Sequence, residues 1–216
     1  MASGNLTRTS LTAATYTNIA AGPASGYTQI INVSICNTNA SAVQIRLALC
    51  ATGTSTPAAS DFIEYDAYIA GYGVLEKTGI ALGAGHIILA YANSANVNFV
   101  VNGLEGLGTA SSGIMGRIDM PAATWQTLVS APSAGRMKAV TVNITNRNIT
   151  STQVRLCIAS NPVSPAAGDY IEYNYLLAAS SVLERTGILI DSGKGVGVYT
   201  STTGVSAVAH GIEDSA

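Results

Sequence analysis

The chain has 216 residues, with ten Lys and Arg against twelve Asp and Glu and a formal net charge of -2. This near balance excludes the strong positive field on which a general nucleic-acid binder relies. A mean hydropathy of +0.33 with only 10% charged residues excludes intrinsic disorder, which requires low hydrophobicity and high net charge.

Short segments with period-two alternation follow one another along the chain. In 29–37, apolar residues alternate with polar ones, which is typical of a half-buried strand. The segment 43–50 repeats the pattern, and the turn-forming residues 37–42 between the two segments predict a hairpin. No segment shows a helical period over three turns. Further strands are expected over 62–69, 73–80, 86–92 and 97–101.

The chain contains a tandem duplication. The block 57–105 returns as 165–213, with 20 identities in 49 aligned positions and an offset of 108. Upstream of this block the offset is 109, so that 37–47 matches 146–156. The strand pattern of the first copy therefore recurs in the second. Each copy has about a hundred residues, which is long enough to bury its own core.

We therefore expect two similar domains, residues 1–105 and 116–216, joined by a Gly/Ser-rich linker over 106–115. Regular short strands separated by turn signals predict an all-β, antiparallel β-sandwich in each copy, or a jelly-roll or barrel-like variant of one. The duplication also bears on function. A building block that fills two quasi-equivalent positions needs its module twice, whereas an enzyme rarely needs two copies of one active site.

The two histidines do not indicate catalysis or a metal site. The repeat counterpart of His86 is Lys194 and that of His210 is Asn102, so neither position requires an imidazole. A zinc site needs three or four clustered ligands, and a catalytic triad needs a histidine with its partners. We therefore expect no catalytic residue, no metal and no cofactor.

Three other features have plain structural interpretations. The glycine-rich segments 83–86 and 191–197 lack the phosphate-loop motif and are expected to form hairpin turns. The chain starts without the basic and apolar segments of a secretory signal, so we expect synthesis in a cytosol. The cysteines have no C-x-x-C spacing and are expected to be reduced, buried or half-buried apolar residues: Cys36, Cys50 and Cys157.

Glutamates recur at matching places in both copies. Paired acids flanking a cleft can hydrolyse glycosides, which keeps a hydrolase among the alternatives. The preferred interpretation is that each glutamate joins a cross-strand ion pair that fixes the strand register. The exchange of Lys77 for Arg185 between the copies keeps the charge, as this interpretation requires. The expected structural ion-pair residues are Arg46, Glu64, Glu76, Lys77, Arg155, Glu172, Glu184 and Arg185.

Tyrosines and the N-terminal segment supply the candidate partner-binding residues. A tyrosine can bury its ring against a partner while its hydroxyl stays hydrogen-bonded, and many of the ten tyrosines fall near expected strand ends. The polar segment 2–8 is expected to act as an anchoring arm. Trp125, which aligns with Tyr16, is expected at a core-like position rather than on a sugar-binding platform. The candidates are Ala2, Ser3, Asn5, Arg8, Tyr68, Tyr72 and Tyr175.

Several sequence blocks carry a resemblance to a known family: 61–65, 74–80 and 100–105, together with the opening 2–6 and the ending 208–213. In these blocks the chain resembles the small β-sandwich virion structural proteins of tailed bacteriophages, particularly those of cyanophages and related aquatic phages. The resemblance covers most of both copies, and the chain departs from the single-module pattern by its duplication.

The resemblance implies a non-enzymatic capsid decoration or cement protein that binds the outer surface of the major capsid lattice. The implied partners are the major capsid protein or other virion proteins, and further copies of this chain in a dimer or trimer. The implied location is the virion, after synthesis in the bacterial cytoplasm. No nucleic-acid or membrane partner is expected. Two further alternatives are a tail, neck, baseplate or fibre component of the virion and a carbohydrate-binding module for a host surface.

Overall fold

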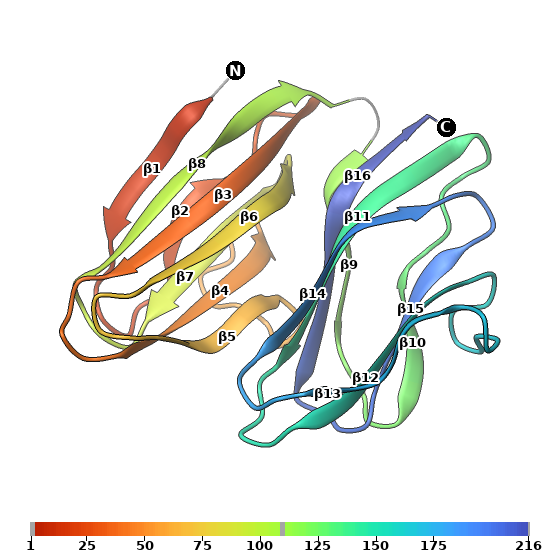
Figure 1. Ribbon diagram of the computed structural model, residues 1–216. Helices are drawn as coiled ribbons and strands as arrows, with labels where there is room; N and C mark the ends of the chain where they lie inside the picture. The colour runs from red at the N-terminus through yellow and green to blue at the C-terminus, as the bar shows by residue number, and fades with distance from the viewer. Residues whose placement is uncertain (1–2, 109–110, 216) are drawn as a thin grey trace.

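The computed structural model describes residues 3–108 and 111–215, which form strands β1 to β16 and no helix (Figure 1). The all-β class is confirmed. In this described part of the chain, no helix could cross a membrane. The strands of the first half are β1 (Gly4–Ser10), β2 (Thr17–Ala21), β3 (Tyr27–Asn37), β4 (Val43–Ala51), β5 (Phe62–Ile69), β6 (Val74–Gly83), β7 (His86–Ala92) and β8 (Val97–Leu107). Those of the second half are β9 (Ser111–Asp119), β10 (Thr124–Val129), β11 (Arg136–Asn146), β12 (Thr152–Ala159), β13 (Tyr170–Leu177), β14 (Val182–Ile190), β15 (Gly195–Thr200) and β16 (Val205–Ser215).

Each half is a sandwich of two four-stranded antiparallel sheets. The first half contains sheet A, in the order β1-β8-β3-β6, and sheet B, in the order β2-β7-β4-β5. The second half repeats both orders in sheet C, β14-β11-β16-β9, and sheet D, β10-β15-β12-β13. In both halves the chain crosses between the sheets at every connection except the one between the fourth and fifth strands. An eight-stranded double sheet with this connectivity is a jelly roll, so the chain is a tandem jelly roll.

Alternation along the strands builds the main apolar core of each half. In β3, Ile31, Val33 and Ile35 are fully buried between sheets A and B, and the residues between them face the other way. A separate cluster fills the second half, with Leu156 and Val198 among its members. Both cores consist mainly of Val, Ile and Leu, so packing of branched side chains between the sheets holds each sandwich together.

The predicted hairpin over 37–42 is wrong, because β3 and β4 belong to opposite sheets. Alternation shows which residues face the core, but both sheets of a sandwich share that core. The connection is held by the buried side chain of Asn37. Its Nδ2 donates to the carbonyls of Ser41 and Ala70, and its Oδ1 accepts the Asn39 N–H. Asn146 makes the same bonds at the equivalent connection of the second half.

The glycine-rich segments form turns, as predicted, but not hairpins. The turn after Gly83 joins β6 of sheet A to β7 of sheet B, and the turn over 191–194 joins β14 of sheet C to β15 of sheet D. Gly85 and Gly193 have φ values of 79° and 89°, a region that glycine adopts without steric cost. These turns therefore carry the chain across the sandwich.

Most of the expected linker is extended strand. Residues 106–107 continue β8 and residues 111–115 start β9, while 109–110 lie outside the described residues. We propose that the boundary between the two domains lies within the few residues that separate these strands.

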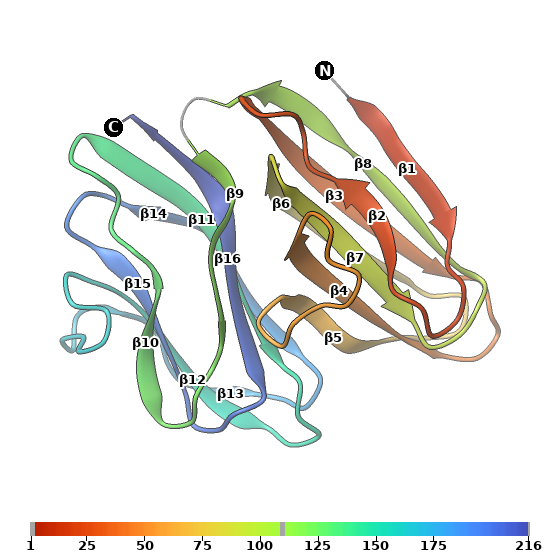
Figure 2. The same ribbon diagram turned by 180° about the vertical axis from the view of Figure 1, so that it is seen from behind.

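The two sandwiches meet through unlike surfaces (Figures 1 and 2). In the first half, β5 and β6 are the edge strands of sheets B and A on the same side of the sandwich. Strands β9, β11 and β16 of sheet C lie against these two edges. Val208, on the face of sheet C that points away from its own core, is fully buried in the core cluster of the first half. We call this contact between the halves the seam.

Candidate interaction surfaces

A charged pair closes one part of the seam. Arg117 of β9 donates from Nη1 to Oδ1 of Asp61 at 2.8 Å. The Asp61 carboxylate is buried, and its Oδ2 also accepts the N–H of Ala58 at 2.9 Å. Next to this pair, Gly113 of β9 lies directly against Gly83 and His86. A buried carboxylate needs such partners, so the seam depends on Arg117.

A second charged group lies where the sheets of the first half meet sheet C. The Nζ atom of Lys77 lies 2.8 Å from Oε1 of Glu64 in its own half and 2.8 Å from Oε2 of Glu184 in the second half. Burial raises the pKa of Glu64, against the opposing effect of Lys77. Burial lowers the pKa of Lys77, but the two carboxylates outweigh it and the net pKa is raised. Lys77 is therefore a charged bridge between the halves.

Polar side chains of sheet C bind the backbone of the first half's edge. Thr145 donates from Oγ1 to the carbonyl of Phe62, and Ser206 donates from Oγ to the carbonyl of Ala59. The edge of a sheet presents unpaired backbone groups, and covering it prevents unwanted pairing. The seam therefore supplies hydrogen-bond donors to backbone carbonyls at this edge of the first sandwich and covers the edge.

A cluster of mostly half-buried aromatic rings around an arginine occurs in each half. The Arg46 cluster consists of Tyr16, Arg46, Tyr65 and Tyr91 on sheet B, and the guanidinium carbon of Arg46 lies 4.2 Å and 5.0 Å from the ring centres of Tyr65 and Tyr91. Each of its members has a repeat counterpart. These counterparts form the Arg155 cluster on sheet D: Trp125, Arg155, Tyr173 and Tyr199.

Trp125 is half-buried and lies outside the core cluster of its half, so its expected core-like position is wrong. Its ring centre lies 5.7 Å from that of Tyr199 and 6.0 Å from that of Tyr170. The strand pattern could not show this, because Trp125 is at the beginning of β10, where no alternation marks the inner face.

The expected ion-pair residues have the following partners. Arg46 binds Asp66 rather than one of the glutamates, from Nε to Oδ1 at 2.6 Å. Arg155 donates to Asn174, the counterpart of Asp66, and Glu76 accepts from Ser34. The remaining pairs, Lys77 with Glu64 and Arg185 with Glu172, join strands of opposite sheets rather than neighbouring strands of one sheet.

The candidate partner-binding residues are scattered over several elements. Tyr68 at the end of β5 and Tyr72 in the following turn are each 72% exposed, and Tyr175 of β13 is 41% exposed. Arg8 lies exposed on β1 and donates from Nε to Oδ1 of Asn5. Ser3 accepts the N–H of Glu105. Ala2 lies outside the described residues.

The anchoring-arm interpretation of the N-terminal segment needs correction. Residues from Gly4 onward form β1, the edge strand of sheet A, which pairs with β8 along its length. Its polar residues gave no strand alternation, so the pairing was missed.

Three of the four duplicated glutamates, Glu64, Glu172 and Glu184, are held in ion pairs. Lys77 binds both Glu64 and Glu184, and Arg185 binds Glu172. Glu64 is only 7% exposed, so little of it is left to face a substrate. Within 3–108 and 111–215, no group of three or more His, Cys, Asp or Glu side chains is placed to hold a metal ion.

All three cysteines are free and buried or half-buried, as predicted. Cys50 and Cys157 are buried, and burial raises the pKa of Cys50 to about 12 and that of Cys157 to about 11. Cys36 is half-buried on the outer side of sheet A. A thiol with a raised pKa is a poor nucleophile at neutral pH, so Cys50 and Cys157 serve packing.

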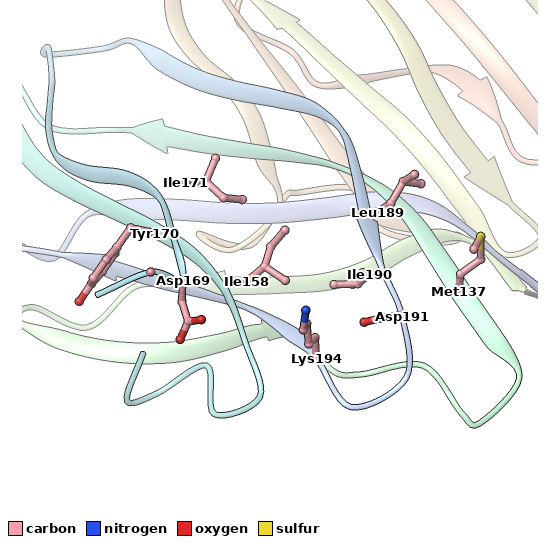
Figure 3. Close-up of a pocket in the computed structure, with 10 residues that line it drawn as sticks. Met137, Ile158, Asp169, Tyr170, Ile171, Leu189, Ile190, Asp191 and Lys194 are labelled. Carbon is pink, nitrogen blue, oxygen red and sulfur yellow. The ribbon is translucent and has the colours of Figure 1, made fainter. Parts of the chain in front are cut away.

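A surface pocket of about 490 Å³ lies on the edge of the second half, beside β13 and β14 (Figure 3). Its polar lining comes from Asp169, Asp191 and Lys194, and its apolar lining includes Ile171 and Leu189. In the first half, the equivalent place is filled by β9 at the seam. The pocket therefore lies on an open edge of the second half, whereas β9 covers the equivalent edge of the first half.

Sequence inspection missed Asp61, Arg117, Gly113 and His210 as seam residues. A signal was present for two of them, because the chain contains Ser-Gly-x-x-x-Arg twice, at 3–8 and at 112–117. The motif has no general meaning, and only the structure shows that its second occurrence contacts the other half.

No family model and no curated protein matches the chain. Among solved structures, it is similar to the major capsid protein of STIV, at 11% identity and a TM-score of 0.33 over 96% of this chain and 95% of that chain. The major capsid protein of bacteriophage PM2 has 12% identity and a TM-score of 0.33 over 95% of this chain and 97% of that chain. The tandem CBM22 domains of Paenibacillus barcinonensis Xyn10C have 7% identity and a TM-score of 0.25 over 89% and 80%. Because these TM-scores are low, the jelly-roll assignment rests on the strand order.

Proposed function

We propose that the chain is a non-enzymatic structural protein of a phage virion, and specifically a decoration or cement protein. It binds the outer surface of the major capsid lattice and stabilises the head. The observation that carries this proposal is the presence of the same Arg–aromatic cluster on both halves of one interlocked chain. The sequence blocks that resemble phage virion proteins also support it.

The two clusters have the composition of protein-binding surfaces. Tyr, Trp and Arg are enriched at the energetically important centres of interfaces. In the Arg46 cluster, Asp66 and the rings hold the guanidinium in place, which lowers the entropy cost of burying it against a partner. A capsid lattice repeats its surface many times, so two modest contacts per chain add through multivalency.

The engaged acidic residues favour a structural role over hydrolysis. A glycosidase needs one carboxylic acid and one carboxylate that both reach the scissile bond. Here Glu64 and Glu172 are each bound by a cation of their own half. The two glutamates also belong to different halves.

A carbohydrate-binding module is the second candidate. The exposed ring of Tyr173, at 59%, favours it, because sugars stack on exposed aromatic faces. Against it, the guanidinium of Arg155 lies 4.6 Å and 4.9 Å from the ring centres of Tyr173 and Tyr199. A face that carries a guanidinium is not free to stack on a sugar.

A tail, neck, baseplate or fibre component would differ from a decoration protein in copy number.

The test combines copy number with binding. Quantitative mass spectrometry of purified virions should find on the order of hundreds of copies per particle, as a lattice-wide protein requires. Purified chain should co-sediment with heads that lack it and raise the temperature at which they release DNA. The variant R46A/R155A should bind less, while R136A, which changes an exposed cation outside both clusters, should bind as the parent does.

Three outcomes would overturn the proposal. A few copies per particle would assign the chain to the tail or neck. Binding to a glycan array that is lost in the Y173A variant would assign it to a host-surface carbohydrate. Hydrolysis of a glycan that is lost in E64Q/E172Q would assign it to an enzyme.

A further inference from the structure

The seam joins a sheet face of the second half to a strand edge of the first. Because the halves share sequence and strand order, each of these surfaces has a counterpart in the other half. The counterpart of the covering face is the outer face of sheet A. The counterpart of the covered edge is the pair β13 and β14. Most of both counterparts lies outside the seam (Figures 1 and 2), although Glu184 of β14 binds Lys77 across the seam and Ile30 of sheet A borders sheet C.

Equivalent residues on the two edges differ in burial, and those on the β13–β14 edge are the more exposed. Ile63 on the first half's edge is 1% exposed, and its counterpart Ile171 is 39% exposed. Ala81 is 2% exposed, and its counterpart Leu189 is 63% exposed. The second position even carries the larger apolar side chain. A partner on the β13–β14 edge would bury these side chains as the seam buries their counterparts.

The pocket in Figure 3 lies at this edge. Asp169, in its lining, is the counterpart of Asp61 and repeats one of its bonds: its Oδ2 accepts the N–H of Ala166 at 2.8 Å. The cation that Asp61 receives from Arg117 has no equivalent at Asp169 within the described chain. The other lining residues correspond as well: Tyr170 to Phe62, Asp191 to Gly83 and Lys194 to His86.

The segment that would fill the pocket is also in the chain, at β1. Its sequence Ser3-Gly4-x-x-x-Arg8 repeats the Ser112-Gly113-x-x-x-Arg117 of β9. Gly4 and Gly113 have nearly the same φ, 94° and 96°. At Gly113 this conformation brings the backbone against His86 and Gly83, whereas Gly4 has no neighbour that a Cβ would meet. β1 therefore has the backbone conformation with which β9 contacts the other half, but Gly4 makes no such contact.

We propose that the chain associates with a second copy through a repeat of its own seam. The outer face of sheet A and strand β1 of one copy cover the β13–β14 edge of the next copy. In this contact Arg8 pairs with Asp169, as Arg117 pairs with Asp61. The contact is head-to-tail, so each chain offers one docking face and one docking edge.

The remaining seam contacts have compatible counterparts. Glu184, which reaches Lys77 across the seam, corresponds to Glu76, and Lys77 corresponds to Arg185. Arg185 of one copy would therefore bind Glu76 of the next. Asn102 replaces His210 and keeps an acceptor for the N–H at position 189, and Asn98 replaces Ser206 and keeps a donor. These exchanges preserve the hydrogen-bonding role, whereas Cys36, which replaces Thr145, offers only a weaker thiol donor.

Charge exchange tests the pairing in the full chain. Sedimentation velocity over a concentration series should show reversible association of the parent. R8D and D169R should each weaken it about tenfold or more, because each places like charges together. The double variant R8D/D169R should restore it, while circular dichroism shows that all three variants are folded. Chains that stay monomeric at every concentration, or a double variant no better than the singles, would overturn the proposal.

Disulfide trapping tests the geometry independently of affinity. Ser112 lies against Gly83 at the seam, so cysteines at the counterpart positions, S3C and D191C, should link different copies under mild oxidation. A ladder of linked chains is expected from S3C/D191C and not from S3C alone, which controls for the native Cys36. The absence of a ladder from the double variant, under conditions where the parent associates, would contradict the contact. Neither experiment depends on the proposed role in a virion.

Discussion

Nδ1 of His210 accepts the backbone N–H of Ala81 at 3.3 Å, which joins β16 of the second sandwich to β6 of the first. The other ring nitrogen lies 3.3 Å from the side-chain amide of Asn143. With Nδ1 acting as an acceptor, the ring is neutral. The seam therefore depends on one uncharged histidine at its centre.

Acid should weaken the seam through His210. Burial lowers its pKa to about 4, with the charge of Lys77 adding to the effect and that of Glu184 opposing it. A pKa lowered in the folded state means that the unfolded chain binds the proton first, so stability falls as pH drops below about 6.5. Between pH 7 and pH 5 the loss from this residue should be about 2 kcal/mol.

Urea unfolding at pH 7 and pH 5 measures this loss. In H210N, which introduces the amide found at the counterpart position Asn102, the difference between the two pH values should shrink, and His86, whose pKa burial also lowers, accounts for a remainder. If the variant keeps the full pH dependence of the parent, His210 is not its source.

Replacing Gly113 should cost much more stability than replacing Gly4. Both have a φ that side-chain-bearing residues rarely adopt, so G4A should lose about 1 kcal/mol. A Cβ at Gly113 would in addition lie 2.3 Å from Nδ1 of His86 and 2.7 Å from the backbone nitrogen of Gly83. G113A should therefore lose about 3 kcal/mol or more in thermal or urea unfolding. Equal losses in the two variants would mean that β9 does not pack against the first half.

Removing the cation of Lys77 should destabilise the chain strongly. In K77M, Glu64 stays buried and Glu184 stays half-buried, both without their partner, and a loss of about 3 kcal/mol is expected. The double variant K77M/E64Q should recover part of this loss, because it removes the buried charge that K77M leaves behind. Calorimetric unfolding provides the comparison. A double variant less stable than K77M would show that Glu64 is stabilised by something other than Lys77.

Asn37 and Asn146 should be needed for the connections between opposite sheets. Each side chain is fully buried, donates to backbone carbonyls and accepts a backbone N–H. N37A and N146A should each lose about 2 to 3 kcal/mol, because the backbone groups of the turn lose their partners. The matched control is N39A, in the same turn but half-buried. A loss in N39A as large as in N37A would contradict the role given to the buried amide.

The strands with clear alternation could be predicted, and the sheets could not. The expected segments over 43–50, 62–69 and 86–92 correspond to β4, β5 and β7. Strands β1 and β9 are rich in Gly, Ser and Thr, and their burial does not alternate strictly, so they were not found. The pairing of strands within each sheet could not be predicted either, because strands of both sheets turn the same apolar pattern toward one core.

The same limit applies to the charged residues. The repeat predicted that Lys77 and Glu64 take part in ion pairs, but it showed neither that their pair joins opposite sheets nor that a third member, Glu184, comes from the other half. Arg46 was expected to pair with a glutamate and instead binds Asp66, which has a positive φ of 50° within β5. A local irregularity of this kind changes where side chains point, and no sequence period reports it.

The most direct measurement for the proposed function is a cryo-electron microscopy reconstruction of the virion that carries this chain. The account predicts paired jelly rolls at regular positions on the outside of the head, with the Arg46 and Arg155 clusters against the capsid protein. Heads without this density, or density confined to the tail, would contradict it.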